Sequence, residues 1–210
     1  MAGDFEVPIR GRYLKKAAAV NYAGIILAAG ESSRMGTPKA LLELRGETFV
    51  DRLIRCFAPY CSPIIVVLGH EPEIVRAGIR SGDKAAFVLN TDYQRGQFSS
   101  LQCGLRAVPL TADGVAFTPV DHPNIEPSTI GKLIDTRAVI AIPQYLGRHG
   151  HPVLCSAALI PEFLALPPES QAPVVMHRHQ DQIRYIDVAD PGILDDIDDP
   201  EAYRRLLAAG

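Results

Sequence analysis

A stretch rich in glycine and serine carries the residue types that bind phosphate. It follows a short apolar run and reads Leu27-Ala28-Ala29-Gly30-Glu31-Ser32-Ser33-Arg34-Met35-Gly36-Thr37-Pro38-Lys39. Glycine lets backbone NH groups approach an anion closely because it has no side chain. Arg34 can form paired hydrogen bonds with phosphate oxygens, and Lys39 supplies a compact positive charge. The stretch predicts a phosphate-binding loop, and the alternative is an ordinary turn with solvated charges.

Two familiar phosphate-binding motifs do not match this stretch. The Walker A loop has Gly, Lys and Ser or Thr in direct succession, whereas Thr37 and Pro38 separate Gly36 from Lys39. The dinucleotide-binding pattern G-x-G-x-x-G does not occur there either. We therefore expect the loop to bind phosphates in a different arrangement.

An aspartate follows a later apolar run. Asp121 comes soon after Val115-Ala116-Phe117, which reads as a buried strand. A carboxylate at such a place needs a cation or hydrogen-bond donors. Asp121 is therefore a candidate metal ligand, and a helix cap or a turn is the alternative.

The elements that must position these residues alternate between strand and helix. Apolar runs typical of strands alternate with helical patterns over residues 25–27, 49–57, 64–68, 71–79, 85–89, 99–107, 115–117 and 127–137. This order predicts an α/β fold with a single doubly wound, mostly parallel, Rossmann-like sheet. A small mixed β extension is expected over 138–142, 152–154 and 183–188, with a last helix over 200–207. Ligands of such sheets bind at the carboxyl ends of the strands.

The loop sequence L-A-A-G-x-S-x-R-M-G-x-P-K resembles the signature of the nucleotidyltransferase family that includes molybdenum cofactor cytidylyltransferases and guanylyltransferases. The resemblance covers residues 23–207 and implies the fold of nucleotide-diphospho-sugar transferases. It implies that the loop wraps a triphosphate and that Arg34 and Lys39 are catalytic, stabilising charge during transfer. The backbone of Leu27, Ala28, Ala29 and Gly30 would meet the base. Leu-Ala-Ala-Gly is typical of the cytidylyl group, so CTP is expected rather than GTP or another nucleotide.

A second matching segment runs from Asn90 to Leu101 and resembles the family's Gly-Gln-Ser-Ser-Ser-Leu at the start of a helix. Phe98 stands where the family has serine. The resemblance assigns nucleotide binding to Asn90, Gln97, Ser99 and Ser100. Capping of the helix by the two serines is the alternative.

Two acidic segments resemble the family's metal site. Val120-Asp121-His122-Pro123 is similar to Gly-Asp-x-Pro, in which the aspartate binds catalytic magnesium, although Val120 replaces the glycine. The segment from Asp196 to Tyr203 resembles the ending of the cytidylyl group and makes Asp198 the second ligand of Mg²⁺ or Mn²⁺. Helix capping is the competing interpretation of these acidic residues.

A last matching segment, from Gly147 to Leu154, is close to Gly-Arg-x-Gly-His-Pro-Val. It implies an acceptor pocket that contains Arg148, His149, Gly150 and His151. A tight structural turn is the alternative. His149 and His151 are two positions apart, so on a strand both would point to one face, as a pair of zinc ligands could. The sequence offers no further obvious ligands, so zinc is not expected. His177 and His179 are expected on a solvated face.

Together these matches predict an enzyme that transfers CMP from CTP to the terminal phosphate of molybdopterin and releases pyrophosphate. A molybdoenzyme is a possible partner. Two alternatives stay open. One is a transferase of the same fold acting on a sugar or polyol phosphate, and the other is a non-catalytic carrier that holds a cofactor for a partner enzyme, which the Val120 substitution favours.

Composition agrees with a protein that binds small molecules. The 210 residues carry 21 Lys and Arg against 24 Asp and Glu, a net charge of −3, which argues against broad binding to nucleic acid or an anionic membrane. The four cysteines form no CxxC pair, so reduced thiols and a cytoplasmic location are expected. We expect one nucleotidyltransferase domain over residues 23–210, preceded by an arm over residues 1–22.

Overall fold

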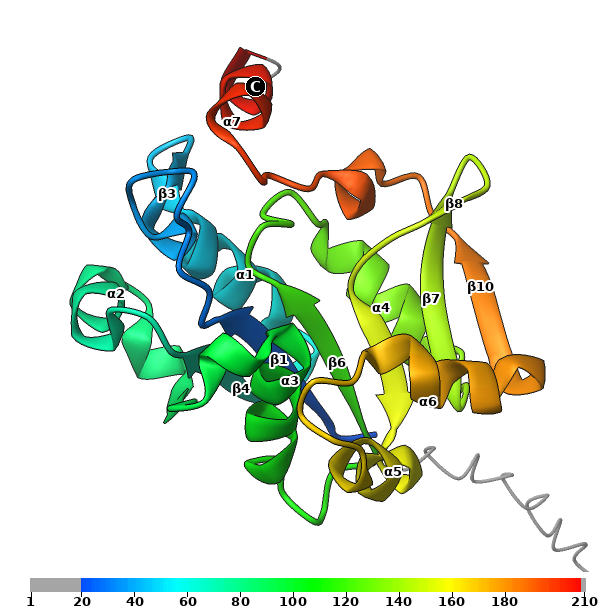
Figure 1. Ribbon diagram of the computed structural model, residues 1–210. Coiled ribbons are helices and arrows are strands. Elements are labelled where there is room, and N and C mark those ends of the chain that lie inside the picture. The colour runs from blue at the N-terminus through cyan, green and yellow to red at the C-terminus, as the bar shows by residue number, and fades with distance from the viewer. Residues whose placement is uncertain (1–19, 209–210) are drawn as a thin grey trace, which may run out of the picture.

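One mixed sheet forms the centre of the protein, with the strand order β10-β7-β9-β6-β1-β4-β5 and with β8 paired to β7 (Figure 1). The computed structural model describes residues 20–208. The strands are β1 (Tyr22–Ala28), β4 (Cys61–Leu68), β5 (Ala86–Leu89), β6 (Gly114–Pro119), β7 (Ile140–Tyr145), β8 (Arg148–His149), β9 (Val153–Ser156) and β10 (Ile183–Asp187). A separate hairpin consists of β2 (Glu43–Leu44) and β3 (Glu47–Thr48).

The main-sheet strands β1, β4, β5 and β6 are parallel to one another. β1 pairs with β4 on one side and with β6 on the other, and β5 pairs with β4. All residues of β1 are buried, as are residues 64–68 of β4. Strands covered on both faces need apolar side chains throughout, which is why these segments read as unbroken apolar runs. The predicted doubly wound α/β fold is confirmed.

Helices cover both faces of the sheet (Figure 1). The apolar residues of α1 (Phe49–Phe57) and α4 (Pro127–Asp135) share one core, to which α2 (Pro72–Gly78) and α7 (Pro200–Ala208) also contribute. Those of α3 (Gln97–Arg106), α5 (Ile160–Ala165) and α6 (Ala172–Arg178) share the other core. Ile26 packs in the first core and Ile25 in the second, because successive side chains of a strand point to opposite faces.

The β extension belongs to the main sheet. β9 is antiparallel to both β6 and β7 and lies between them, whereas β10 is parallel to β7. The expected pairing of residues 138–142 with 152–154 is therefore present as β7 with β9. The insertion of β9 beside β6 was not predicted, because it depends on a contact between segments far apart in the chain.

Several boundaries differ from the sequence-based expectations. α3 begins at Gln97 rather than at Ser99, and Tyr22, expected in the amino-terminal arm, is a buried residue of β1. Residues 1–19 of the expected arm lie outside the described residues. The hairpin β2–β3 and helix α5 were not predicted. Within residues 20–208, every helix is too short or too polar to span a membrane.

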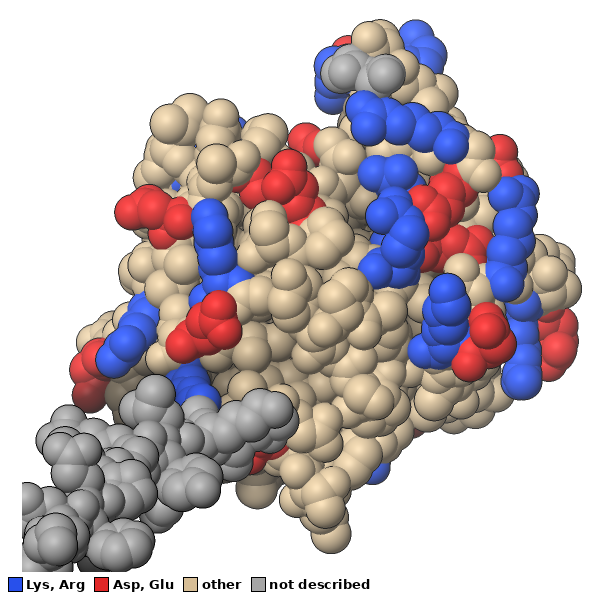
Figure 2. All heavy atoms as spheres, turned by 180° about the vertical axis from the view of Figure 1, so that it is seen from behind, with Lys and Arg blue, Asp and Glu red and all other residues tan. Residues whose placement is uncertain are grey.

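Charged side chains of both signs are mixed on the face shown in Figure 2. Ion pairs such as Arg55–Glu47 and Arg80–Glu43 also bring exposed side chains of opposite charge together. The described residues of the face in Figure 2 therefore form no extended region of one charge.

Candidate active site

The loop after β1 forms a wall of a cavity of about 590 Å³ at the carboxyl end of that strand. Many of the residues predicted to bind the nucleotide line this cavity: Leu27, Ala28, Ala29, Gly30, Arg34, Lys39, Gln97 and Ser100. Asp121 and Asp198, the predicted metal ligands, line it as well. The structure thus brings together residues from four segments that the sequence separates widely.

The loop folds back on itself so that Lys39 returns to the cavity. The Met35 NH donates to the Ser32 carbonyl at 2.8 Å, which closes a turn, and the Lys39 NH donates to Ser32 Oγ at 2.8 Å. Gly36 has φ of +66°, a conformation that glycine adopts without strain. These contacts hold the start of the 3-10 helix Lys39–Leu41 against the loop, and the side chain of Lys39 is only 13% exposed.

Lys39 lies between the two predicted metal ligands. Its Nζ is 2.5 Å from Asp198 Oδ1 and 3.5 Å from Asp121 Oδ2. Arg34 extends from the opposite part of the loop, with Nη2 4.0 Å from Asp198 Oδ2. Two cations and two carboxylates therefore face one another at the wall of the cavity. Lys39 and Arg34 can bind phosphate oxygens when a ligand replaces the carboxylates as their partner.

Backbone contacts explain why Asp121 and Asp198 meet. The Ile197 NH donates to the Asp121 carbonyl at 3.0 Å, and the Ile197 side chain is buried in the core. The Val120 NH donates to the Leu27 carbonyl at 3.0 Å, which continues the pairing of β6 with β1. Valine in place of the family's glycine is therefore accommodated, because its buried side chain packs into the core while Asp121 still lines the cavity.

A further carboxylate belongs to this cluster. Asp121, His122 and Asp196 each offer a ligand atom, and these atoms lie within 4.8 Å of one another. Asp121 Oδ1 and His122 Nδ1 are buried without a hydrogen-bond partner among residues 20–208. Carboxylate oxygens are preferred ligands of Mg²⁺ and Mn²⁺, and a buried unpaired oxygen gains most from a cation. The cluster therefore fits a divalent metal ion, with Asp196 a candidate ligand beside Asp121 and Asp198.

Electrostatic interactions act differently on the three carboxylates. Burial raises the pKa of Asp121, and the nearby Asp198 adds to the rise while Lys39 opposes it. The hydrogen bond from Lys39 lowers the pKa of Asp198. Burial and the charges of Asp121 and Asp198 raise the pKa of Asp196. The crowding of negative charge is thus compensated only in part by Lys39, which again favours a bound cation.

The predicted nucleotide-binding residues after β5 divide into two groups. Gln97 and Ser100 line the first cavity, whereas Asn90 and Ser99 do not. Asn90 Nδ2 donates to the hydroxyls of Ser99 and Ser100 at 2.9 and 3.0 Å, and the Ser99 hydroxyl donates to the Gly96 carbonyl at 2.8 Å. In this structure Asn90 and Ser99 therefore support the cavity wall from behind, because Asn90, just after β5, and Ser99, in the first turn of α3, are both buried.

A second cavity, of about 850 Å³, adjoins the first. All of the predicted acceptor-binding residues line it: Arg148, His149, Gly150 and His151. Leu27, Gly96, Gln97 and Pro119 line both cavities, and His122 and Asp196 line the second from the side of the acidic cluster. Two ligands in these cavities would therefore meet near the acidic cluster.

The histidines in the second cavity differ in their surroundings. Burial lowers the pKa of His151 to about 3 and that of His122 to about 4, so both rings are neutral at neutral pH. His149 is exposed and stacks on Tyr185 with ring centroids 4.0 Å apart. His149 and His151 are not part of the metal-ligand group found among residues 20–208. His177 is exposed, as predicted, whereas His179 Nε2 lies 2.8 Å from Glu162 Oε1.

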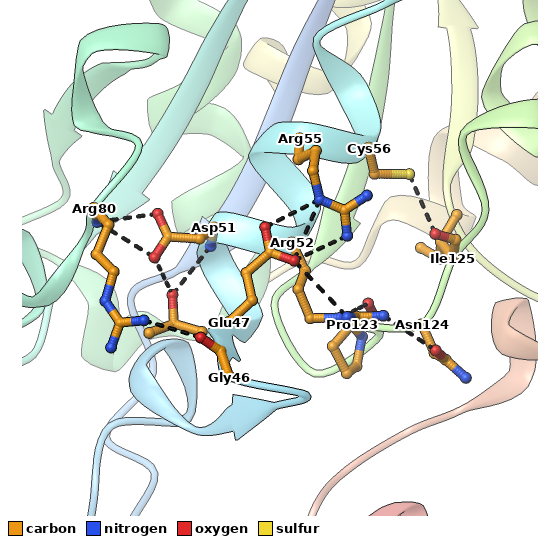
Figure 3. A network of polar contacts seen from close by, with 11 residues as sticks. Gly46, Glu47, Asp51, Arg52, Arg55, Cys56, Arg80, Pro123, Asn124 and Ile125 are labelled. Atoms are coloured by element: carbon orange, nitrogen blue, oxygen red, sulfur yellow. Dashed lines mark hydrogen bonds and ion pairs between the residues drawn. The ribbon is translucent and has the colours of Figure 1, made fainter. Parts of the chain in front are cut away.

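A polar network beneath the site fixes the turn that follows Asp121 (Figure 3). Arg52 of α1 donates from Nε to the Pro123 carbonyl at 3.2 Å and from Nη2 to Asn124 Oδ1 at 3.4 Å. Asn124 Nδ2 donates in turn to Asp195 Oδ2 at 3.1 Å, next to Asp196. The Cys56 thiol donates to the Ile125 carbonyl at 3.3 Å. The two acidic segments are thus joined through one asparagine.

Sequence reasoning missed this supporting network. Asp190 is another missed residue: it is buried and accepts hydrogen bonds from Thr129 Oγ1 at 2.7 Å and from the Glu126 and Gly192 NH groups. Only the rule that buried acidic groups need partners could have singled it out, and its burial is not visible in the sequence.

Comparison with known proteins identifies the family and the fold. The family model described as "MobA-like NTP transferase domain" matches residues 24–183. The molybdenum cofactor cytidylyltransferase of Escherichia coli K12 is 28% identical over 182 residues, which cover 85% of this chain and 92% of that protein. A probable molybdenum cofactor guanylyltransferase of Opitutus terrae is 34% identical over 113 residues, or 53% of each protein.

A solved structure shows the same architecture. Rv0371c of Mycobacterium tuberculosis H37Rv, in complex with manganese, superposes with a TM-score of 0.72 at 28% sequence identity. The superposition covers 91% of this chain and all of the other. The similarity therefore extends over most of the chain.

Proposed function

The chain belongs to the MobA-like NTP transferase domain family and is a nucleotidyltransferase, and on this basis we propose that it transfers CMP from CTP to the terminal phosphate of molybdopterin. Pyrophosphate is the other product. The convergence of Lys39, Asp121 and Asp198 in the first cavity, which adjoins the second, carries the proposal. One cavity then takes the nucleotide and the other takes the acceptor.

The choice of CTP is supported by the loop that would meet the base. Its Leu-Ala-Ala-Gly sequence, residues 27–30, resembles the cytidylyl group, and the E. coli cytidylyltransferase is similar over 85% of the chain. A sugar or polyol phosphate as acceptor is the remaining alternative, because the loop recognises the triphosphate and not the acceptor.

The acidic cluster would hold a magnesium or manganese ion through Asp121 with Asp198 or Asp196. A bound divalent ion neutralises phosphate charge and polarises the phosphoryl group under attack. The neighbouring Lys39 lies in the cavity wall, paired with Asp198, so its charge is already positioned beside the site of the phosphates. Arg34, whose side chain is 67% exposed, is free to move onto the triphosphate.

The reaction needs charge compensation more than proton transfer. An oxygen of the acceptor phosphate attacks the α-phosphorus in line, and the bond to the bridging oxygen of pyrophosphate breaks. The attacking phosphate is already ionised at neutral pH, so a general base is unnecessary. Arg34 and Lys39 reduce the repulsion between the two anions and stabilise the departing pyrophosphate.

The test is pyrophosphate release by the full chain with Mg²⁺, molybdopterin and each of the four nucleoside triphosphates in turn. We expect release with CTP and a rate lower by about 100-fold or more in Asp121→Asn, because a buried site for the cation is lost. Asp83→Asn is the matched control, since Asp83 is exposed and lies outside both cavities.

Three results would contradict the proposal in different ways. Near-normal turnover of Asp121→Asn would remove the metal assignment. Turnover with a sugar or polyol phosphate but not with molybdopterin would change the acceptor. Binding of CTP and molybdopterin without any pyrophosphate would indicate a carrier.

A further inference from the structure

An ion pair joins two walls of the second cavity. Arg95 ends the 3-10 helix Tyr93–Arg95, and Glu169 lies in the loop between α5 and α6. Arg95 Nε donates to Glu169 Oε1 at 2.7 Å, and Arg95 Nη2 lies 2.6 Å from the same oxygen. Both residues line the cavity. The pair therefore lies within the space assigned to the acceptor.

The geometry of this pair allows exchange. The side chains of Arg95 and Glu169 are 44% and 58% exposed, and exposed ion pairs contribute little to stability because water screens them. The Nε and Nη2 donors of Arg95 both bind a single oxygen of Glu169, and Nη1 lies 3.9 Å from Asp92 Oδ2. A phosphate group can accept the same two donors on two oxygens, in the paired geometry that suits a guanidinium. A phosphate can therefore displace Glu169 at small cost.

The position of Arg95 favours the acceptor over the nucleotide as its ligand. Arg95 lines only the second cavity, whereas the next residues, Gly96 and Gln97, line both. Among the described residues that line the second cavity, Arg148 is the one other Lys or Arg. Much of the remaining wall is apolar: Phe98, Leu101, Phe117, Ile142, Val153 and Met176. An anionic group that enters this cavity thus meets Arg95 close to the junction of the two cavities.

We propose that Arg95 binds the phosphate of the acceptor and that Glu169 occupies the guanidinium until the acceptor replaces it. The identity of the bound group as the acceptor's phosphate rests on the proposed function. Glu169 then acts as a competitor for Arg95, which disfavours ligands in the second cavity that carry no anionic group. The carboxylate is released toward solvent when the phosphate binds.

Opposite effects of two variants test this exchange. With the full chain, CTP and Mg²⁺, Arg95→Gln is expected to raise the KM for molybdopterin about tenfold, because charge-assisted hydrogen bonds are lost. Glu169→Gln is expected to lower that KM, since the competitor is removed. The KM for CTP stays unchanged in both. Arg106→Gln, an exposed arginine at the end of α3, is the matched control and leaves both values unchanged.

A purely structural ion pair predicts something else. Each variant breaks the same contact, so both would change the KM in the same direction, and that result overturns the proposal. In the double variant, the KM for molybdopterin should equal that of Arg95→Gln alone. Glu169 competes for Arg95, so its removal has no effect when Arg95 is missing. A gain of the size seen in the single Glu169→Gln variant also overturns the exchange.

A binding measurement separates this inference from the proposed reaction. The Nε–Hε signal of Arg95 in a nitrogen-15 spectrum, assigned by its loss in Arg95→Gln, is followed during titration with inorganic phosphate. We expect the signal to shift in the wild type and to shift at lower phosphate in Glu169→Gln. A shift without turnover of molybdopterin supports the anion site and contradicts the reaction. Turnover of molybdopterin, with no shift of the Arg95 signal and no change of the KM for molybdopterin in the variants, overturns the anion site alone.

Discussion

Three buried polar atoms without a partner among residues 20–208 all belong to the walls of the two cavities. They are Asp121 Oδ1, His122 Nδ1 and His151 Nδ1. Burial of an unpaired polar atom is unfavourable, so such atoms are rare unless a ligand, water or ion pairs with them. Individual residues here are therefore arranged for binding at some cost in stability.

His151 gives this cost a measurable pH dependence. Its pKa is about 3 in the folded state and about 6.5 when unfolded, so the unfolded chain binds more protons between those values. Keeping the buried ring neutral therefore costs no stability above pH 6.5, and the free energy of unfolding falls as the pH falls from 6.5 toward 3. In urea unfolding from about pH 7 to about pH 4, His151→Asn should lose less stability than the wild type, by up to about 1.4 kcal/mol per pH unit.

The exposed His177 offers the comparison for this titration. His177→Asn should keep the wild-type dependence of stability on pH, because this side chain is exposed and lies outside both cavities. Equal pH dependence in His151→Asn and the wild type would show that the buried ring does not resist protonation.

At the scale of elements, α1 carries both a core face and a supporting residue for the site. Its apolar side chains pack against the sheet, while Arg52 reaches the turn after Asp121 (Figure 3). The side chain of Arg52 is 12% exposed, and that of Arg55, which shares the partner Glu47, is 57% exposed. One helix thus has a nearly buried and an exposed arginine beside the same carboxylate.

This pair of arginines makes a matched comparison. Arg52→Met should lower the free energy of unfolding by about 1–3 kcal/mol, because it leaves the Pro123 carbonyl and Asn124 without their donor. It should also raise the metal concentration needed for half-maximal activity. Arg55→Met should cost less than about 1 kcal/mol, as exposed ion pairs do. Equal costs, or an unchanged metal requirement in Arg52→Met, would show that the turn is held by other contacts.

At the scale of the whole molecule, the last segment of the chain completes a site begun by the first strand. Asp198 reaches Lys39 across 159 positions. α7 then packs on the first hairpin, where the Tyr203 hydroxyl donates to the Glu43 carbonyl at 2.7 Å and its ring contacts Phe49 edge-on. The segment with Asp196 and Asp198 is therefore anchored by Ile197 within it and by α7 after it.

Truncation after Asp199 tests this anchoring. The shortened chain keeps all strands and the other helices, so its circular dichroism should change only by the loss of α7. We expect the rate of pyrophosphate release to fall by about tenfold or more, because a misplacement of about 1 Å at a site can cost that much. Full activity of the shortened chain would mean that Ile197 alone positions Asp198.

The alternation of strands and helices and most parts of the site were predictable from the sequence. Unbroken apolar runs such as 64–68 reflect burial on both faces, which is a local property of each segment. The loop from Leu27 to Lys39 and Asp121 were singled out by residue type and position, and Asp198 by the resemblance of its segment to the cytidylyl group. The structure brings them to the same cavity.

Only the tertiary structure decided which of these residues line the cavities. It placed Asn90 and Ser99 behind the wall, added Asp196 to the acidic cluster, and inserted β9 between β6 and β7. It also paired Arg95 with Glu169, 74 positions away. A sequence pattern indicates which side chains within a short segment are buried. Contacts between distant segments depend on the packing of the whole sheet, and no local pattern contains that information.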